Sequence, residues 1–367
     1  MNYYLFTTDL RRAGAQHVVS VLAERWSRDV NVTIIIIKND VEFNLPANVR
    51  VLPLDCATDP LHFYSGLMVW QAKHKLESIL NEENGAFALY SFLESPNFIS
   101  VLIKKKFPNG IFIGSSRTSI LLYNRLFRLF YPSYTNLDGF IVNSEANKRL
   151  FVEQFGLPEN MVHFIPNPID FKSIQYQANE GRPQMLDQVA VNKKRILGVG
   201  RMVKQKNFSL LMRAFALLTK TESNVHLIIL GDGPERRRLT NLAKRLGIAN
   251  QLTMPGKVVN PYIWMANADL FVLSSNYEGW PNVLIEAMVM GLPVVACDCP
   301  TGPAEILGNG DHGVLVPKND VEAMTAAMTS KLQSKKTPYF FLREWNADSI
   351  ANRYRAVAES ILTQRNG

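Results

Sequence analysis

Two carboxylates eight residues apart frame the segment of the chain that is richest in chemical groups. The segment covers residues 277–288, reads YEGWPNVLIEAM, and holds Glu278 and Glu286. A turn and a predicted helix start lie between the two acids and consist of Gly279, Pro281, Asn282 and Val283. The free N–H groups of a helix start attract phosphate, and carboxylates accept hydrogen bonds from the paired hydroxyls of a sugar or ribose. The alternative is a structural turn followed by a helix with one solvated acid.

A second candidate site lies in the loop after the predicted strand 195–199. Gly200 ends the strand, and Arg201 and Lys206 follow before the next predicted helix. Arginine binds phosphate oxygens as a fork and lysine binds them as a point charge, so the pair indicates phosphate binding. The Gly-x-Gly sequence here is not a dinucleotide fingerprint, because the third glycine and the following acid are missing.

Four further loops are candidates because each follows a predicted strand. Gly231 begins a GDGP turn, which is either a structural turn or a ligand contact, and Lys257 with Val258 follows the next strand, where backbone could lie against a nucleotide base. In the first half of the chain, small residues allow a ligand to approach the backbone closely between the first strand and the first helix. The residues of that loop are Gly14, Ala15 and Gln16. Arg117 follows the strand 111–114, and we expect it to project from the strand end.

Parallel strands with helices between them would bring all these loops to the same edge of a sheet. The first half alternates predicted strands at 2–7, 32–37, 49–54, 86–90, 111–114, 139–142 and 162–165 with predicted helices at 15–28, 65–80, 95–105 and 145–155. The second half has predicted strands at 195–199, 225–230, 251–254, 270–274, 293–296 and 313–316, and predicted helices at 208–219, 235–246, 283–290, 321–330 and 347–363. This alternation predicts an α/β fold with buried parallel sheets.

The length of 367 residues favours two domains over one. We predict two Rossmann-like doubly wound domains that face a central cleft, since such sheets bind ligands at the carboxyl ends of their strands. The first domain is expected at 1–168, a polar linker at 169–194, and the second domain at 195–345. The last segment, 346–367, is predicted to be a helix that packs back on the first domain.

Composition narrows the classes of protein that the chain can be. Three cysteines are too few for a disulfide framework, and we expect their thiols to be buried and free. We expect the protein to be located in the cytoplasm. No apolar run reaches the length of a membrane span, and the first residues do not form a signal peptide. The chain has no Asp-x-Asp pair, no histidine-rich metal pattern, no nucleophile elbow and no Walker loop.

The net charge of +8 indicates an anionic partner. Basic residues gather at Lys104–Lys106 and in the stretch 117–134, where leucines and aromatic residues alternate with Arg125 and Arg128. This composition is typical of a helix at a lipid headgroup surface, and also of a core helix whose two arginines extend to solvent.

At these residues the chain resembles family 4 of the retaining glycosyltransferases, which have the GT-B architecture of two Rossmann-like domains. The resemblance covers nearly the whole chain. It rests on EGWPNVLIEAM with its two glutamates, the loop GRMVKQKN, the GDGP turn, IPNPID at 165–170, TGPAEI at 301–306 and GVLVP at 313–317.

The resemblance implies a role for each part of the second domain. Arg201 and Lys206 would hold the donor diphosphate with the backbone around Asn282 and Val283, so that no metal ion or other cofactor is needed. The donor sugar would contact Glu278, and the ribose would contact Glu286. The base would lie beside the loop at Lys257 and Val258. Glu278, Arg201 and Lys206 are the expected catalytic residues, and the other donor-side positions are Gly200, Gly231, Gly279 and Pro281. Retention without an enzymatic nucleophile implies same-face attack assisted by the leaving phosphate.

Two departures from the family pattern lie in the first domain. The family's first loop usually reads Gly-Gly-Ala-Glu, where this chain has Ala13-Gly14-Ala15-Gln16. Ser116 and Arg117 stand where many relatives have a His-Asp pair. A Ser-x-Arg sequence at this place resembles transferases of bacterial glycan assembly that often use UDP-linked N-acetylhexosamines. The expected donor is therefore a UDP-sugar, and the expected acceptor is a glycan or a polyprenyl-diphosphate-linked molecule at the inner face of the cell membrane.

Two other classes of protein remain as alternatives. A nucleotide-sugar epimerase shares the architecture but would place acid and base groups at the sugar. A nucleic-acid-binding protein would explain the basic charge, but the chain has no recognised binding motif for it.

Overall fold

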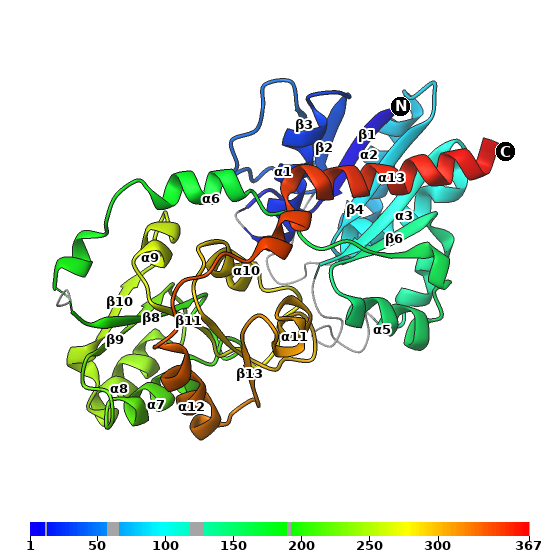
Figure 1. Ribbon diagram of the computed structural model, residues 1–367. Helices are drawn as coiled ribbons and strands as arrows, with labels where there is room; N and C mark the ends of the chain where they lie inside the picture. Colours follow the sequence, from blue (N-terminus) through cyan, green and yellow to red (C-terminus); the bar gives the residue numbers. More distant parts are fainter. Residues whose placement is uncertain (12, 57–65, 118–127, 189–191, 367) are drawn as a thin grey trace. The chain divides into compact units, whose positions relative to one another are not determined.

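The computed structural model describes residues 1–11, 13–56, 66–117, 128–188 and 192–366 of the chain (Figure 1). The chain divides into two compact units. Unit 1 consists of Met1–Pro168 and Glu344–Gly367, and unit 2 consists of Ile169–Arg343. Each unit is built on a parallel sheet with helices, which confirms the predicted α/β class and the two Rossmann-like domains.

Unit 1 contains, within the described residues, a seven-stranded parallel sheet in the order β3-β2-β1-β4-β5-β6-β7. The strands are β1 (Asn2–Thr7), β2 (Val32–Ile36), β3 (Arg50–Pro53), β4 (Phe87–Phe92), β5 (Gly110–Ser116), β6 (Gly139–Val142) and β7 (Val162–Phe164). The central strands β4 and β5 are buried along their whole length, which explains why their sequences are apolar or small without alternation.

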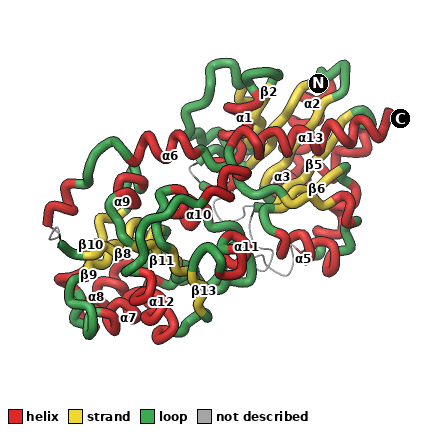
Figure 2. Tube along the Cα trace, viewed as in Figure 1, coloured by secondary structure: helices red, strands yellow, loops and turns green. Residues whose placement is uncertain are grey.

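Helices cover both faces of this sheet (Figure 2). On one face lie α2 (Gly66–Asn81), α3 (Glu94–Ile103) and α5 (Glu145–Phe155), whose apolar residues form one hydrophobic cluster with the strands. On the other face lie α1 (Gly14–Trp26) and α13 (Ala347–Asn366), which form a second cluster. Short 3-10 helices occur at η1 (Lys104–Lys106), η3 (Tyr131–Asn136) and η4 (Glu159–Met161).

Helix α13 belongs to unit 1 although it follows all of unit 2 in the sequence. Its residue Tyr354 is fully buried, and its main chain accepts two hydrogen bonds from the unit 1 core. Trp26 Nε1 donates to Ala351 O at 3.0 Å, and Tyr90 Oη donates to Tyr354 O at 2.7 Å. The helix is therefore part of the core and not a surface addition.

Unit 2 contains, in its described part, a six-stranded parallel sheet in the order β10-β9-β8-β11-β12-β13. The strands are β8 (Lys194–Val199), β9 (Val225–Leu230), β10 (Leu252–Gly256), β11 (Leu270–Leu273), β12 (Val294–Cys297) and β13 (Val314–Val316). Apolar residues of α7 (Phe208–Leu218), α8 (Arg236–Leu246) and α12 (Val321–Lys331) pack in one cluster. Figure 1 shows α9 (Tyr262–Ala266) and α10 (Asn282–Val289) on the opposite side of the sheet, and α11 (Pro303–Ile306) follows β12.

The predicted linker at 169–194 is wrong, because this segment is part of unit 2. It contains α6 (Phe171–Ala178), which begins where Asp170 Oδ1 accepts a hydrogen bond from Ser173 N at 2.9 Å. Ile174 and Ala178 are buried, and α6 packs on α9. One buried pair at i, i+4 is too short a pattern to show a helix in a polar sequence.

Two of the three lysines predicted to contact a membrane form ion pairs within unit 1. Lys104 Nζ pairs with Asp138 at 2.9 Å, and Lys106 Nζ pairs with Glu77 at 2.8 Å, so two of the three clustered lysines hold carboxylates of unit 1. The greater part of the basic-aromatic stretch, residues 118–127, lies outside the described residues. Within the described ranges, no helix combines the length and apolarity that crossing a membrane requires. The three cysteines are buried and free, as predicted.

Candidate active site

The loops that carry the predicted donor-side residues all follow strands of the unit 2 sheet at the same edge. The order of strands reverses between β8 and β11, since β9 and β10 lie on one side and β12 and β13 on the other. In open parallel sheets this switch point is where ligands bind. The loop 200–207 follows β8 and the loop 274–281 follows β11, so both flank the switch point.

Two backbone hydrogen bonds and one close backbone approach hold the loops after β8, β9 and β10 together. Gly200 N donates to Leu230 O at 2.9 Å, and Gly231 N donates to Gly256 O at 2.8 Å. A Cβ atom at Gly231 would lie 2.0 Å from Gly200 O, so no side chain fits there. This close packing brings Gly200 and Gly231 together, and the chain continues from Gly256 into the predicted base-side loop.

The side chains of two predicted donor residues at this edge point to solvent. Arg201 and Lys257 are exposed, and neither side chain forms a hydrogen bond or ion pair with any described residue, while Val258 is half-buried. Exposed guanidinium and ammonium groups at the carboxyl ends of the strands can bind a phosphate without first breaking another contact.

Lys206 and Glu278 form the ion pair at the centre of the site. Lys206 Nζ lies 2.6 Å from Glu278 Oε1, and both side chains are largely buried. Ser275 Oγ donates to the same oxygen at 2.6 Å. The structure thus joins two of the three predicted catalytic residues across the switch point.

The start of α10 lies directly after Glu278 in the sequence. Its first turn has no side-chain cap, and it begins at Asn282 and Val283 after Gly279 and Pro281. Main-chain N–H groups of such a turn, together with the helix dipole, suit an anion.

Glu286 lies one turn into α10 and is half-buried. Burial raises the pKa of Glu286 to about 7. The carboxyl therefore changes charge near neutral pH.

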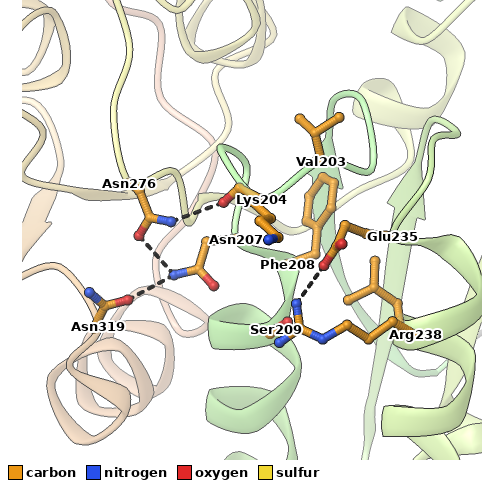
Figure 3. A pocket seen from close by; sticks show the side chains of 10 residues that line it. Val203, Lys204, Asn207, Phe208, Ser209, Glu235, Arg238, Asn276 and Asn319 are labelled. Atoms are coloured by element: carbon orange, nitrogen blue, oxygen red, sulfur yellow. Dashed lines mark hydrogen bonds and ion pairs between the residues drawn. The ribbon is translucent and has the colours of Figure 1, made fainter. Parts of the chain in front are cut away.

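Side-chain amides fasten the loop 200–207 to the loop after β11 (Figure 3). Asn207 Nδ2 donates to Asn276 Oδ1 at 3.1 Å, and Asn276 Nδ2 donates to Lys204 O at 2.9 Å. Asn207 Nδ2 also donates to Asn319 Oδ1 at 3.0 Å. These residues line a hollow of about 230 Å³ beside the start of α7. These hydrogen bonds connect the two loops that carry Lys206 and Glu278.

A third loop, after β12, supports the main chain of the site. Thr301 Oγ1 donates to Glu278 O, and a Cβ atom at Gly302 would lie 2.7 Å from Gly279 O. Ser275 and Thr301 carry no pattern that reveals these bonds in the sequence alone. A serine three residues before an acid at a strand end is the one local sign of the Ser275 contact.

The predicted acceptor-side loop of unit 1 also lies at a switch point, between β1 and β4. Gly14 and Ala15 begin α1, and Gln16 is buried. Gln16 Nε2 donates to Asp9 Oδ1 at 3.0 Å, and Arg11 Nη2 lies 3.0 Å from Asp9 Oδ2. Asp9 is almost fully buried and anchors the loop, a role that its sequence position alone does not show.

The expectation that Arg117 projects from its strand end is wrong. Its side chain is buried, with Nε donating to Ser115 Oγ at 2.8 Å and Nη1 donating to Ile165 O at 3.0 Å. The guanidinium also lies over the ring of Tyr354, 5.1 Å from its centre. Burial lowers the pKa of Arg117 to about 9. Hydrogen-bond acceptors and the ring of Tyr354 lie inside unit 1, so the guanidinium points inward. It thereby connects β5, the end of β7 and α13.

No group of three or more His, Cys, Asp or Glu side chains is arranged to hold a metal ion in the part of the chain that the structure describes. The ionic groups at the unit 2 switch point are the Lys206–Glu278 pair, Arg201, which is exposed, and Glu286, which is half-buried. Cations beside an uncapped helix start can stabilise a diphosphate, and carboxylates can bind hydroxyl groups.

Residues 187–339 match the family described as Glycosyl transferases group 1. This segment contains every unit 2 loop that forms the site, and the match supports glycosyltransferase activity. It covers less than half of the chain, with unit 1 outside it.

Two curated proteins are similar over longer stretches. The N-acetylgalactosamine-N,N'-diacetylbacillosaminyl-diphospho-undecaprenol 4-alpha-N-acetylgalactosaminyltransferase of Campylobacter jejuni is 29% identical over 344 residues, which cover 90% of each chain. The amylovoran biosynthesis glycosyltransferase AmsD of Erwinia amylovora is 29% identical over 283 residues, which cover 65% of this chain and 77% of AmsD.

Solved structures share the fold over nearly the whole chain. Anabaena HepE in complex with UDP superposes with a TM-score of 0.75 at 17% identity, covering 98% of this chain and 100% of HepE. The lipopolysaccharide outer core galactosyltransferase WaaB in its apo form superposes with a TM-score of 0.77 at 16% identity, covering 98% and 99%. The likeness establishes the GT-B fold.

Proposed function

We propose that this chain is a retaining, metal-independent glycosyltransferase of family 4. It transfers a hexose or an N-acetylhexosamine from a UDP-sugar to a glycan or lipid-linked acceptor in the synthesis of bacterial polysaccharide or oligosaccharide. The observation that carries the proposal is the buried Lys206–Glu278 pair at the switch point of unit 2, beside the start of α10. This geometry combines a cation for a phosphate with an acceptor for a hydroxyl group.

The donor half of the proposal assigns the unit 2 residues as follows. Arg201 and Lys206 bind the diphosphate together with N–H groups of the first turn of α10, and Glu286 binds the ribose. Glu278 binds the sugar that is transferred. As the bond to the sugar breaks, negative charge grows on the diphosphate, and the two cations stabilise it in place of a metal ion. The leaving phosphate then assists attack by the acceptor from the same face, which retains the configuration.

Two of the similar proteins support the choice of donor and acceptor. HepE was solved in complex with UDP, and its fold is that of this chain. The Campylobacter enzyme, by its name, transfers N-acetylgalactosamine to a sugar linked to diphospho-undecaprenol. We infer that this chain uses a UDP-sugar and a related lipid-linked acceptor, and that it works in the cytoplasm at the inner face of the cell membrane. The acceptor would meet the β1 end of unit 1, near Gly14, Ala15 and Gln16.

The test is a donor screen followed by an acceptor assay. Thermal shift with UDP-glucose, UDP-galactose, UDP-N-acetylglucosamine, UDP-N-acetylgalactosamine, GDP-mannose and ADP-glucose should show the largest stabilisation with a UDP-sugar. Release of UDP should then require an added undecaprenyl-diphosphate-linked saccharide. Conversion of the donor into its epimer without any acceptor would show an epimerase instead. Stabilisation by none of the six donors would overturn the proposal.

A further inference from the structure

We propose that Ser275 is a positioning residue of the donor site, whose hydroxyl directs the Glu278 carboxylate so that one oxygen is kept for the transferred sugar. The inference rests on the proposed function and adds a residue that neither the motif nor the comparisons single out. Ser275 is completely buried at the carboxyl end of β11. It has no route to a substrate of its own, so it acts through Glu278.

The two oxygens of Glu278 have different surroundings. Oε1 receives both donors, Lys206 Nζ at 2.6 Å and Ser275 Oγ at 2.6 Å. Oε2 accepts no hydrogen bond from any described residue and keeps some exposure to solvent. It is therefore the oxygen that reaches the surface of the site. A carboxylate held in this way offers a single acceptor in a defined direction.

Lys206 alone would not fix that direction. An ammonium group is a point charge on a flexible stem, and it pairs equally well with either oxygen or with both. The Ser275 hydroxyl makes the two oxygens unequal, because Oε1 then accepts hydrogen bonds from both Ser275 Oγ and Lys206 Nζ. Without the hydroxyl, Glu278 can turn and face Lys206 with both oxygens. The open acceptor for the sugar would then be lost, while Lys206 would keep its place and its charge.

The main chain around Ser275 is itself held in place. Cys299 Sγ donates to Ser275 O at 3.1 Å, and Thr301 Oγ1 donates to Glu278 O. Ser274 Oγ donates to Lys206 O at 2.8 Å. Each member of the trio Ser275, Lys206 and Glu278 therefore has a main-chain anchor. Such support is what keeps a functional group within about 0.5 Å of its working position.

The decisive property is a difference between two ligands. UDP has the diphosphate but no sugar, so its binding needs Lys206 and not the orientation of Glu278. A UDP-sugar needs both. Loss of the Ser275 hydroxyl should therefore weaken the UDP-sugar and spare UDP, whereas general damage to the loop should weaken both.

The experiment measures the Kd of UDP and of UDP-N-acetylgalactosamine and UDP-glucose by calorimetry for the wild type and Ser275→Ala. We expect the Kd of UDP to change by no more than about twofold. The Kd of the UDP-sugar that the wild type prefers should rise by about tenfold to a hundredfold, the worth of one hydrogen bond to a charged group. Ser275→Thr keeps the hydroxyl and should restore most of the affinity. If its methyl group does not fit, Ser275→Cys, with a weak donor of similar size, should give an intermediate value.

Ser91→Ala is the matched control, because Ser91 is also fully buried and donates to a main-chain carbonyl, Ile113 O at 3.4 Å, in unit 1. It should leave the ratio of the two Kd values unchanged. Equal losses for UDP and the UDP-sugar in Ser275→Ala, or no loss for either, would overturn the role of Ser275. A wild-type protein that binds no sugar nucleotide would instead overturn the proposed function, and the two failures are distinct.

Discussion

At the scale of single residues, the site depends on a buried ion pair whose two members have different tasks. In the proposed function, Lys206 acts on the charge of the leaving diphosphate, and Glu278 acts on the hydroxyl groups of the sugar. A buried carboxylate with two donors and a buried ammonium with one carboxylate are each satisfied, so the pair can persist in the interior.

We expect Lys206→Ala and Glu278→Ala each to abolish transfer, a loss of about 10²-fold to 10³-fold or more, because each removes a group that acts on the transition state. Both variants should remain folded. The measurement is UDP release with the donor and acceptor identified by the screen, together with circular dichroism. Lys204→Ala is the matched control, since Lys204 is an exposed lysine in the same loop. A wild-type rate in either site variant would show that the site is elsewhere.

Glu286 should make stability depend on pH. Its pKa of about 7 lies above the roughly 4.3 of an exposed glutamate, so the folded state binds the proton more tightly than the unfolded chain. The stabilisation from this proton is fully present below about pH 4.3 and is lost as the pH rises through about 7. Between pH 5 and pH 8 the wild type should therefore lose more stability than Glu286→Gln.

Thermal unfolding at pH 5 and pH 8 measures this difference. Glu322→Gln, which removes an exposed carboxylate in the first turn of α12, provides the comparison and should follow the wild type. Parallel pH profiles for the wild type and Glu286→Gln would contradict the shifted pKa.

At the scale of elements, the site is made by loops that touch through their backbones. Gly231 has a φ of +127° and lies against Gly200, so its lack of a side chain serves both conformation and close approach. The amide contacts of Asn207 and Asn276 add a second connection on the other side of the loop 200–207. The strand ends of β8, β9 and β11 are thereby joined by contacts within the protein.

Gly231→Ala should destabilise unit 2 by more than the strain of a left-handed alanine, which is about 1–2 kcal/mol. Its methyl group would overlap Gly200 O and push the loop 200–207 away. Gly247→Ala is the matched control, because Gly247 also has a positive φ, +72°, but has no atom within 4 Å of the added Cβ. Chemical denaturation of both variants, with the Kd of UDP, gives the comparison. Equal losses of stability would mean that the loop accommodates the methyl group.

Sequence patterns predicted the strands well because burial on both faces demands long apolar runs. The β2 sequence VTIII and the fully buried β4 are examples, and their predicted positions agree with the structure within two residues. The sequence does not predict the short helices α6 and α9, because each buries only two residues. The two helices pack against each other, and this contact is not visible in the sequence. Arg117 was placed wrongly because its acceptors, Ser115 and Ile165, meet only in the folded sheet. Lys206 and Glu278 were found from residue type and strand-end position, but their direct contact was not.

At the scale of the whole molecule, we propose an anionic surface as a partner of unit 1 because of the local cluster of basic residues at Lys104–Lys106 and Arg128. Lys104 and Lys106 are engaged with carboxylates, which leaves Lys105, Arg128 and the apolar pair Leu129 and Phe130 as the described residues for such a contact. Leu129 and Phe130 are 74% and 45% exposed. Apolar residues beside basic ones suit the headgroup region of a membrane.

We expect Lys105→Gln combined with Arg128→Gln to weaken binding to vesicles of phosphatidylglycerol by about tenfold or more, since each charge near the surface contributes about 1 kcal/mol. Leu129→Ser with Phe130→Ser should weaken it further. Co-sedimentation with vesicles measures the effect. Lys244→Gln with Arg245→Gln removes two exposed charges of α8 in unit 2 and should have little influence. Unchanged sedimentation of the unit 1 variants would exclude this surface as the membrane contact.

The return of α13 to unit 1 has a consequence for how the protein is made on the ribosome. Unit 2 is a continuous segment, 169–343, and all of its strands are available once that segment has left the exit tunnel. Unit 1 must wait, because Ala351 and Tyr354 supply the partners of Trp26 and Tyr90 in its core. The domain that is synthesised first is thus completed last, the reverse of the usual N-terminal-first order.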